Sequence, residues 1–220
     1  MFTTERQLVI KLKSNFSPIC NWTSNKLNTE VLEEVNLGYG IADLVITKIK
    51  KEKKTKNSLG YFDILVYKII ESGIKVSISK IKEITKANEF TIKKSLNKLI
   101  VDCYINQQDG YYQFKKSYDL IASDSIAIEA KLKNWKRALN QAYRYKWFAS
   151  QSYVVLDSNY INPALANLED FRKYNVGLAE ICNSGILKIH HRPTSEKPID
   201  DKMFILLNEQ IRLNLLSKQV

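Results

Sequence analysis

Hydrophobic residues recur along this chain at two spacings, one typical of helices and the other of strands. Residues 4–15 carry apolar side chains at helical spacing, and strand-like runs follow at 31–37 and 41–49 with glycines between them that indicate a hairpin. Beyond residue 125 the pattern predicts, in order, a strand at 126–132, a helix at 134–150, a strand at 152–157, a helix after Pro163, short strands at 176–182 and 185–190, and a C-terminal helix. This order predicts an α/β fold with a central mixed sheet flanked by helices.

The segment 59–116 has a different pattern and predicts a separate small domain. A lysine-rich run at 48–58 precedes it and is typical of a solvated linker. Three short amphipathic helices are expected, followed by two strands around Gln107-Gln108-Asp109-Gly110, a good hairpin turn. Three helices and a hairpin resemble a winged helix-turn-helix domain, inserted between two halves of the α/β core.

The third of these helices is the expected DNA-reading element of the inserted domain. Asn88 can cap it, and its outer face carries Lys93, Lys94, Asn97 and Lys98. In a winged helix this helix would enter the major groove, with the lysines on phosphates and Asn97 on an adenine edge. A winged helix that serves protein contacts is the alternative.

Charge supports a polyanionic partner. The 220 residues include 34 Lys and Arg against 23 Asp and Glu, a formal net charge of +11. No strongly basic amphipathic helix stands out, so nucleic acid is favoured over a membrane surface. A lysine-rich composition without any such partner is the alternative.

Cysteines and termini indicate a reducing, cytoplasmic location. Cys20, Cys103 and Cys182 are far apart and form no CxxC pair, which argues against disulfides and a zinc site. His190 and His191 are the only histidines, so a histidine metal pair or a catalytic triad is not expected. No signal peptide or membrane span is expected either.

Three charged residues interrupt otherwise apolar strands. Asp43 lies in the run 41–49, whereas Glu129 and Lys131 lie two apart in the run 126–132 and so share one face of that strand. Charges in such strands are costly unless they pair or hold a metal. We therefore expect Asp43, Glu129 and Lys131 to share one small cleft at the edge of the sheet.

An acid on one strand and Glu-x-Lys on another resemble the PD-(D/E)xK nuclease superfamily, whose restriction-endonuclease-like core the chain would share. The resemblance covers about residues 1–50 and 120–190. Gln141, on the helix after the Glu-x-Lys strand, and Glu5, on the first helix, match further positions often seen in the superfamily, with Glu34 a rival for the role of Glu5. Ala42 replaces the proline of the motif's name, a frequent departure.

The resemblance implies a Mg²⁺-dependent DNA endonuclease, with Mn²⁺ as a substitute. Asp43, Glu129 and the backbone carbonyl of Ala130 would hold the metal, and Lys131 would lie beside the attacking water. The nuclease core would comprise residues 1–50 and 120–220, and residues 59–116 the DNA-binding insertion. Double-stranded DNA is the expected partner, and a homodimer and a role in restriction, repair or mobile elements are compatible with it.

Each of these residues also has a plainer interpretation. Glu129 and Lys131 could form a salt bridge on a half-exposed sheet face, and Asp43 could cap a turn. Gln141 could face solvent and Glu5 could interact with the helix dipole. At the level of function, the alternatives are a non-catalytic DNA-binding regulator built on a nuclease fold and a winged-helix adaptor for a protein partner.

Overall fold

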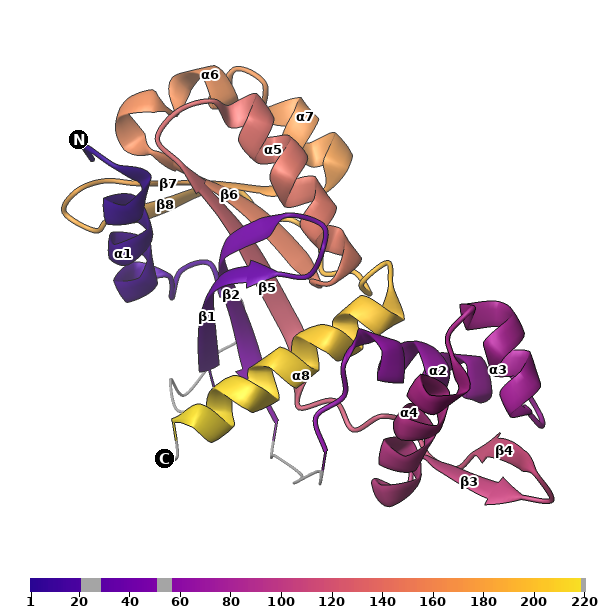
Figure 1. The fold of residues 1–220 in the computed structure, drawn as a ribbon. Helices are drawn as coiled ribbons and strands as arrows, with labels where there is room; N and C mark the ends of the chain where they lie inside the picture. Colours follow the sequence, from indigo (N-terminus) through magenta and orange to yellow (C-terminus); the bar gives the residue numbers. More distant parts are fainter. Residues whose placement is uncertain (21–28, 51–56, 219–220) are drawn as a thin grey trace. The chain divides into compact units, whose positions relative to one another are not determined.

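A computed structural model describes residues 1–20, 29–50 and 57–218 (Figure 1). By its internal contacts the chain divides into two units, Met1–Lys50 with Ala122–Asp200 and Lys51–Ile121 with Asp201–Val220. We refer to these as unit 1 and unit 2. Most of the expected lysine-rich linker falls on residues 51–56, outside the described residues.

Unit 1 is built on a mixed six-stranded sheet in the order β1-β2-β5-β6-β7-β8. Its strands are β1 (Thr29–Asn36), β2 (Ile41–Ile49), β5 (Ala122–Lys131), β6 (Gln151–Asp157), β7 (Gly177–Ile181) and β8 (Leu187–His191). The first three strands and the last pair are antiparallel, whereas β5, β6 and β7 run parallel. The expected α/β class with a central mixed sheet is confirmed.

Helices cover the sheet because each has one apolar face. They are α1 (Glu5–Asn15), α5 (Trp135–Arg144), α6 (Asn162–Leu165) and α7 (Leu168–Tyr174), with 3₁₀ turns η2 (Tyr145–Trp147) and η3 (Ser158–Tyr160). Leu8 and Leu12 of α1 are fully buried in one core cluster with Ile126 and Ile128 of β5. The helix expected at 134–150 is shorter in the structure, since α5 ends at Arg144 and the chain tightens into η2.

Unit 2 contains α2 (Tyr61–Glu71), α3 (Ile78–Thr85) and α4 (Glu89–Val101), then the hairpin β3 (Ile105–Gln108) and β4 (Tyr111–Phe114). The turn of the hairpin holds Asp109 and Gly110 at φ 52° and 78°, left-handed values that favour an Asp-Gly pair. Apolar residues from all three helices and the hairpin form one core.

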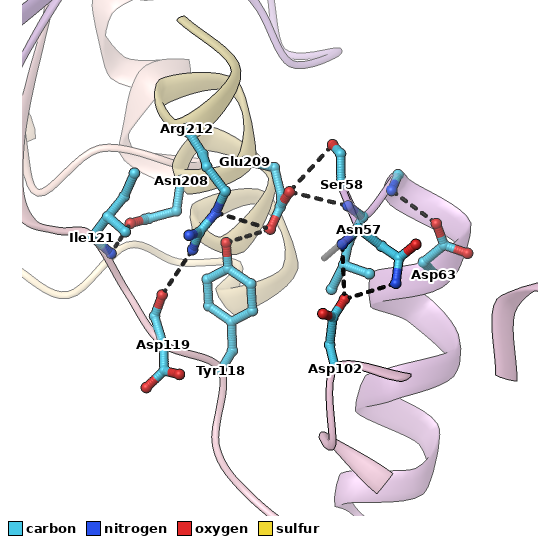
Figure 2. Close-up of polar contacts among 12 residues, drawn as sticks. Asn57, Ser58, Asp63, Asp102, Tyr118, Asp119, Ile121, Asn208, Glu209 and Arg212 are labelled. Carbon is cyan, nitrogen blue, oxygen red and sulfur yellow. Dashed lines mark hydrogen bonds and ion pairs between the residues drawn. The ribbon is translucent and has the colours of Figure 1, made fainter. Parts of the chain in front are cut away.

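The C-terminal helix α8 (Asp201–Ser217) also belongs to unit 2, which corrects the expected assignment of residues 201–220 to the nuclease core. Ile205 of α8 joins the core of unit 2. Glu209, 2% exposed, accepts hydrogen bonds from the Leu59 amide at 3.0 Å and from the Tyr118 hydroxyl at 2.6 Å (Figure 2). The Asn208 side chain accepts one from the Ile121 amide at 3.0 Å. The helix therefore binds the chain on both sides of the α2–β4 segment.

No helix within the described residues is long and apolar enough to cross a membrane.

Candidate active site

The pairing of β2 with β5 brings together the charged residues that interrupt these strands. The two strands are antiparallel, with Leu44 opposite Ile128, so Asp43 and Glu129 each lie one residue beyond this pair. The Asp43 Oδ2 atom accepts a hydrogen bond from the Ala130 amide at 2.7 Å. Residues 87 positions apart in the sequence are thus joined directly.

Glu129 is the most deeply buried acid of the site, at 1% exposure. Its Oε1 atom lies 3.1 Å from Lys131 Nζ, and its Oε2 atom is hydrogen bonded to the Tyr145 hydroxyl. The same hydroxyl lies 2.6 Å from the carbonyl oxygen of Ile41 in β2. Tyr145 therefore links η2 to both strands of the site.

Lys131 bridges two acids from different elements. Besides Glu129 it contacts Glu5 of α1, with its Nζ atom 2.9 Å from Glu5 Oε2. Its side chain is 17% exposed, against 49% for that of Glu5. Lys131 is therefore held close to Glu129 while Glu5 remains open to solvent.

A groove of about 420 Å³ opens beside Asp43. It is lined by Glu5, Arg6, Val9, Ile10, Glu33, Glu34 and Asp43. Glu34 has φ 51°, and the pairing of β1 with β2 passes from Glu33 to Val35 around it. Glu5 and Glu34, the two alternatives for the additional acid of the site, thus both line the groove.

Burial sets the electrostatics of the site. It raises the pKa of Asp43, an effect that the Ala130 amide and Lys131 oppose and that the charges of Glu5 and Glu34 reinforce. Burial likewise raises the pKa of Glu129, with the Tyr145 hydrogen bond opposing and the charge of Asp43 adding. The pKa of Lys131 is raised as well, because its bonds to Glu5 and Glu129 outweigh the opposing effect of burial.

These donors fit a hard divalent cation. Two neighbouring carboxyls whose charges are disfavoured by burial and by other acids would be relieved by a bound cation. Within residues 1–20, 29–50 and 57–218, no group of three or more His, Cys, Asp or Glu side chains is arranged to hold a metal. Mg²⁺ is commonly held by one or two carboxylates with water in its remaining positions, and Asp43 and Glu129 match that number of protein ligands.

Gln141 lies on α5, four residues before Tyr145. Its Oε1 atom is buried and has no hydrogen-bond partner among the described residues, so the plainer interpretation of a solvent-facing residue is wrong for this atom. An unpartnered buried oxygen is costly unless a ligand, an ion or a bound water satisfies it.

Sequence reasoning missed Tyr145 as a member of the site. Tyr145 is fully buried, as a residue of the hydrophobic core would be. The available signal was its position on the helix that follows the Glu-x-Lys strand, one turn after Gln141.

The expected DNA-contacting residues lie on α4 in unit 2 and differ in their surroundings. Lys94 and Asn97 are exposed, and Lys93 pairs with Glu89 at 2.6 Å on the surface. Lys98 instead pairs with Asp63 of α2 at 2.7 Å, and these side chains are 31% and 10% exposed. Lys98 therefore has a role inside unit 2.

Comparison with known protein families, with curated proteins and with solved structures found no match to this chain.

Proposed function

We propose that this protein is a metal-dependent DNA endonuclease of the PD-(D/E)xK type. The observation that carries the proposal is the convergence of Asp43, Glu129 and Lys131 from two strands of one sheet. The plainer interpretation, a surface salt bridge, does not account for a glutamate that is 1% exposed.

Each residue of the site has a chemical role in this proposal. Asp43, Glu129 and the carbonyl of Ala130 would hold Mg²⁺ or Mn²⁺, which when bound supplies charge neutralisation at the phosphate and lowers the pKa of a bound water. Lys131 donates hydrogen bonds toward the water or the phosphate oxygens. Glu5 keeps the Lys131 ammonium beside Glu129.

Unit 2 is proposed to bind duplex DNA as a winged helix. Support comes from its three helices followed by a hairpin and from the exposed Lys93, Lys94 and Asn97 on α4. The net charge of +11 supports the same partner.

Cleavage of plasmid DNA tests the proposal. Wild-type protein should nick or linearise the plasmid with Mg²⁺ or Mn²⁺ and not with EDTA. Asp43→Asn, Glu129→Gln and Lys131→Ala should each lower the rate by about 100-fold or more. Asp124→Asn, which changes a partly exposed acid earlier on β5, is the matched control and should cleave normally. A wild-type protein inactive with both metals, or an Asp43→Asn variant as active as wild type, would contradict the proposal.

One observation favours a second candidate, a non-catalytic DNA-binding protein on the same fold. Both carboxylate oxygens of Glu129 already have protein partners, Lys131 and Tyr145. Such a protein would bind duplex DNA with an affinity that falls steeply with salt, and it would never cleave the DNA.

A further inference from the structure

The outer face of α5 is cationic. The helix contains Lys136, Arg137 and Arg144 and no acid, and all three side chains are exposed. Its opposite face is buried through Ala138, Leu139 and Ala142. The helix is therefore basic and amphipathic, which corrects the expectation that no such helix is present. The side that faces solvent carries only positive charge, which suits a phosphate backbone.

Two exposed tyrosines lie beside these cations. Tyr143 of α5 and Tyr174 of α7 are 43% and 37% exposed, and their ring centroids are 5.3 Å apart in an edge-to-face arrangement. The neighbouring pair between the same two helices, Trp135 and Phe171, differs because Phe171 is fully buried. Figure 1 shows α5 and α7 next to one another in unit 1.

A lysine ammonium lies over one face of each ring. Lys146 Nζ lies 5.7 Å from the centroid of Tyr143, and Lys173 Nζ lies 5.6 Å from that of Tyr174. Lys146 is fixed there by Glu196 at 2.9 Å and by the carbonyl of Tyr174 at 3.2 Å. We call Tyr143, Tyr174, Lys146 and Lys173 the tyrosine platform.

We propose that the tyrosine platform binds a single-stranded stretch of DNA, with bases stacked on the two rings and phosphates along the cations of α5. Exposed aromatic faces interleaved with cations are the usual means of holding unpaired bases. Duplex DNA does not fit the rings in this way because its base faces are already stacked on one another. The inference rests on the proposed nuclease function and refines its substrate to DNA with an unpaired segment next to the cleavage site.

Binding measured without cleavage tests this inference. The probe is a fluorescent mixed-sequence DNA strand of about 15 nucleotides, alone or as its duplex, in buffer with EDTA. The affinity of the double variant Tyr143→Ala/Tyr174→Ala for the single strand should fall. Each stacked base that is lost should lower this affinity by at least about fivefold. The affinity of this variant for the duplex should be unchanged. Tyr143→Phe/Tyr174→Phe, which keeps both rings, should bind like wild type.

Two further comparisons separate stacking from charge and from unfolding. Lys136→Ala should lower the salt dependence of single-strand binding by about 0.7 in the logarithmic slope, whereas the double alanine variant should leave the slope as it is. Tyr61→Ala, at a tyrosine on α2 that is 46% exposed and has no part in the proposed DNA contacts, is the matched control. Should the alanine variant fail to fold, ultraviolet crosslinking of a bromodeoxyuridine strand to the wild-type protein should label Tyr143 or Tyr174.

The outcomes separate this inference from the proposed function. Unchanged single-strand affinity in the folded alanine variant, equal losses for single strand and duplex, or crosslinks elsewhere would each overturn the platform. A wild-type protein that binds the single strand through these tyrosines but cleaves no DNA would instead overturn the nuclease alone.

Discussion

Asp43 places a carboxylate on β2 between two fully buried apolar residues, Ala42 and Leu44. Because burial raises its pKa above the ordinary value of 3.8, the folded state binds the proton more tightly than the unfolded state does. The stability that this group contributes is therefore full below pH 3.8 and is lost as the pH rises through the folded-state pKa. The charged form of Asp43 thus destabilises the metal-free protein near neutral pH.

Asp43→Asn should therefore be more stable than wild type near neutral pH in EDTA, by on the order of 1 kcal/mol. The amide oxygen of asparagine can still accept the bond from the Ala130 amide. The advantage should shrink as the pH falls toward 3.8, and Mg²⁺ should stabilise the wild type more than the variant. Denaturant unfolding at several pH values measures this, and a variant that is less stable at neutral pH would refute it.

Tyr145 fixes the direction of the Glu129 side chain, because its hydroxyl holds one of the two carboxylate oxygens. Partners that orient a metal ligand typically change metal affinity when they are removed. Tyr145→Phe should weaken Mn²⁺ binding by about 10- to 100-fold in calorimetric titration.

Tyr153→Phe is the matched control for this change. Tyr153 is equally buried and lies on the neighbouring strand β6, but the charge that acts on its hydroxyl is that of Arg192. Equal Mn²⁺ affinities in both variants would mean that Tyr145 does not act on Glu129.

At the scale of elements, the lysines of α4 have two different roles, although the sequence predicted one role for all of them. Spacing alone placed Lys98 with Lys93 and Lys94 on one outer face, but it could not show that Asp63 of α2 lies within reach of Lys98. Asp63 also accepts a hydrogen bond from the Gly60 amide at 3.0 Å, at the start of α2. Lys98 is thus part of the packing of α2 on α4.

Lys94→Ala should consequently affect DNA binding, whereas Lys98→Ala should affect stability. Lys94→Ala should lower the slope of logarithmic duplex affinity against logarithmic salt by about one and leave stability unchanged. Lys98→Ala should lower the free energy of unfolding by about 1 kcal/mol and leave the slope unchanged. Anisotropy titrations over a salt series measure the slope, and denaturant unfolding measures the stability of both variants. If the slope falls in both variants, Lys98 also contacts DNA.

The order of helices and strands was predictable because each has a clear hydrophobic period. The strands around Asp43 and Glu129 and the Asp109-Gly110 turn all came from such local signals. Tyr145 did not, since its role depends on the contact of η2 with β2 and β5, which no local pattern encodes.

At the scale of the whole molecule, the position of α8 likewise depends on contacts that no local sequence pattern encodes. Its apolar stripe predicted a packed helix but not its partner, because an apolar side chain such as Ile205 does not specify by itself which core it joins. What assigns α8 to unit 2 is polar: Asn208, Glu209 and Arg212 are 0%, 2% and 3% exposed and bind backbone or side-chain groups at 58–59 and 118–121 (Figure 2). Excision of residues 59–116 alone would remove the Leu59 amide and most of the core that Ile205 joins, so the separable unit includes α8 and the flanking residues up to Ile121.

Glu209→Ala should therefore loosen unit 2 and spare unit 1. The change leaves the Leu59 amide and the Tyr118 hydroxyl without their acceptor and removes the carboxylate 3.8 Å from Arg212, at a cost of about 3 kcal/mol. In hydrogen exchange, the amides of Leu59 and Ile121 should exchange faster, whereas that of Val154 in β6 should not change.

Leu213→Ala, at a position of α8 that is 50% exposed, is the matched control and should leave all these amides unchanged. If Glu209→Ala speeds exchange equally in β6 and at Leu59, the two units unfold together and α8 stabilises the whole chain. If exchange at Leu59 does not change, the bonds of Glu209 contribute little, and the apolar contact of Ile205 holds α8 to unit 2 by itself.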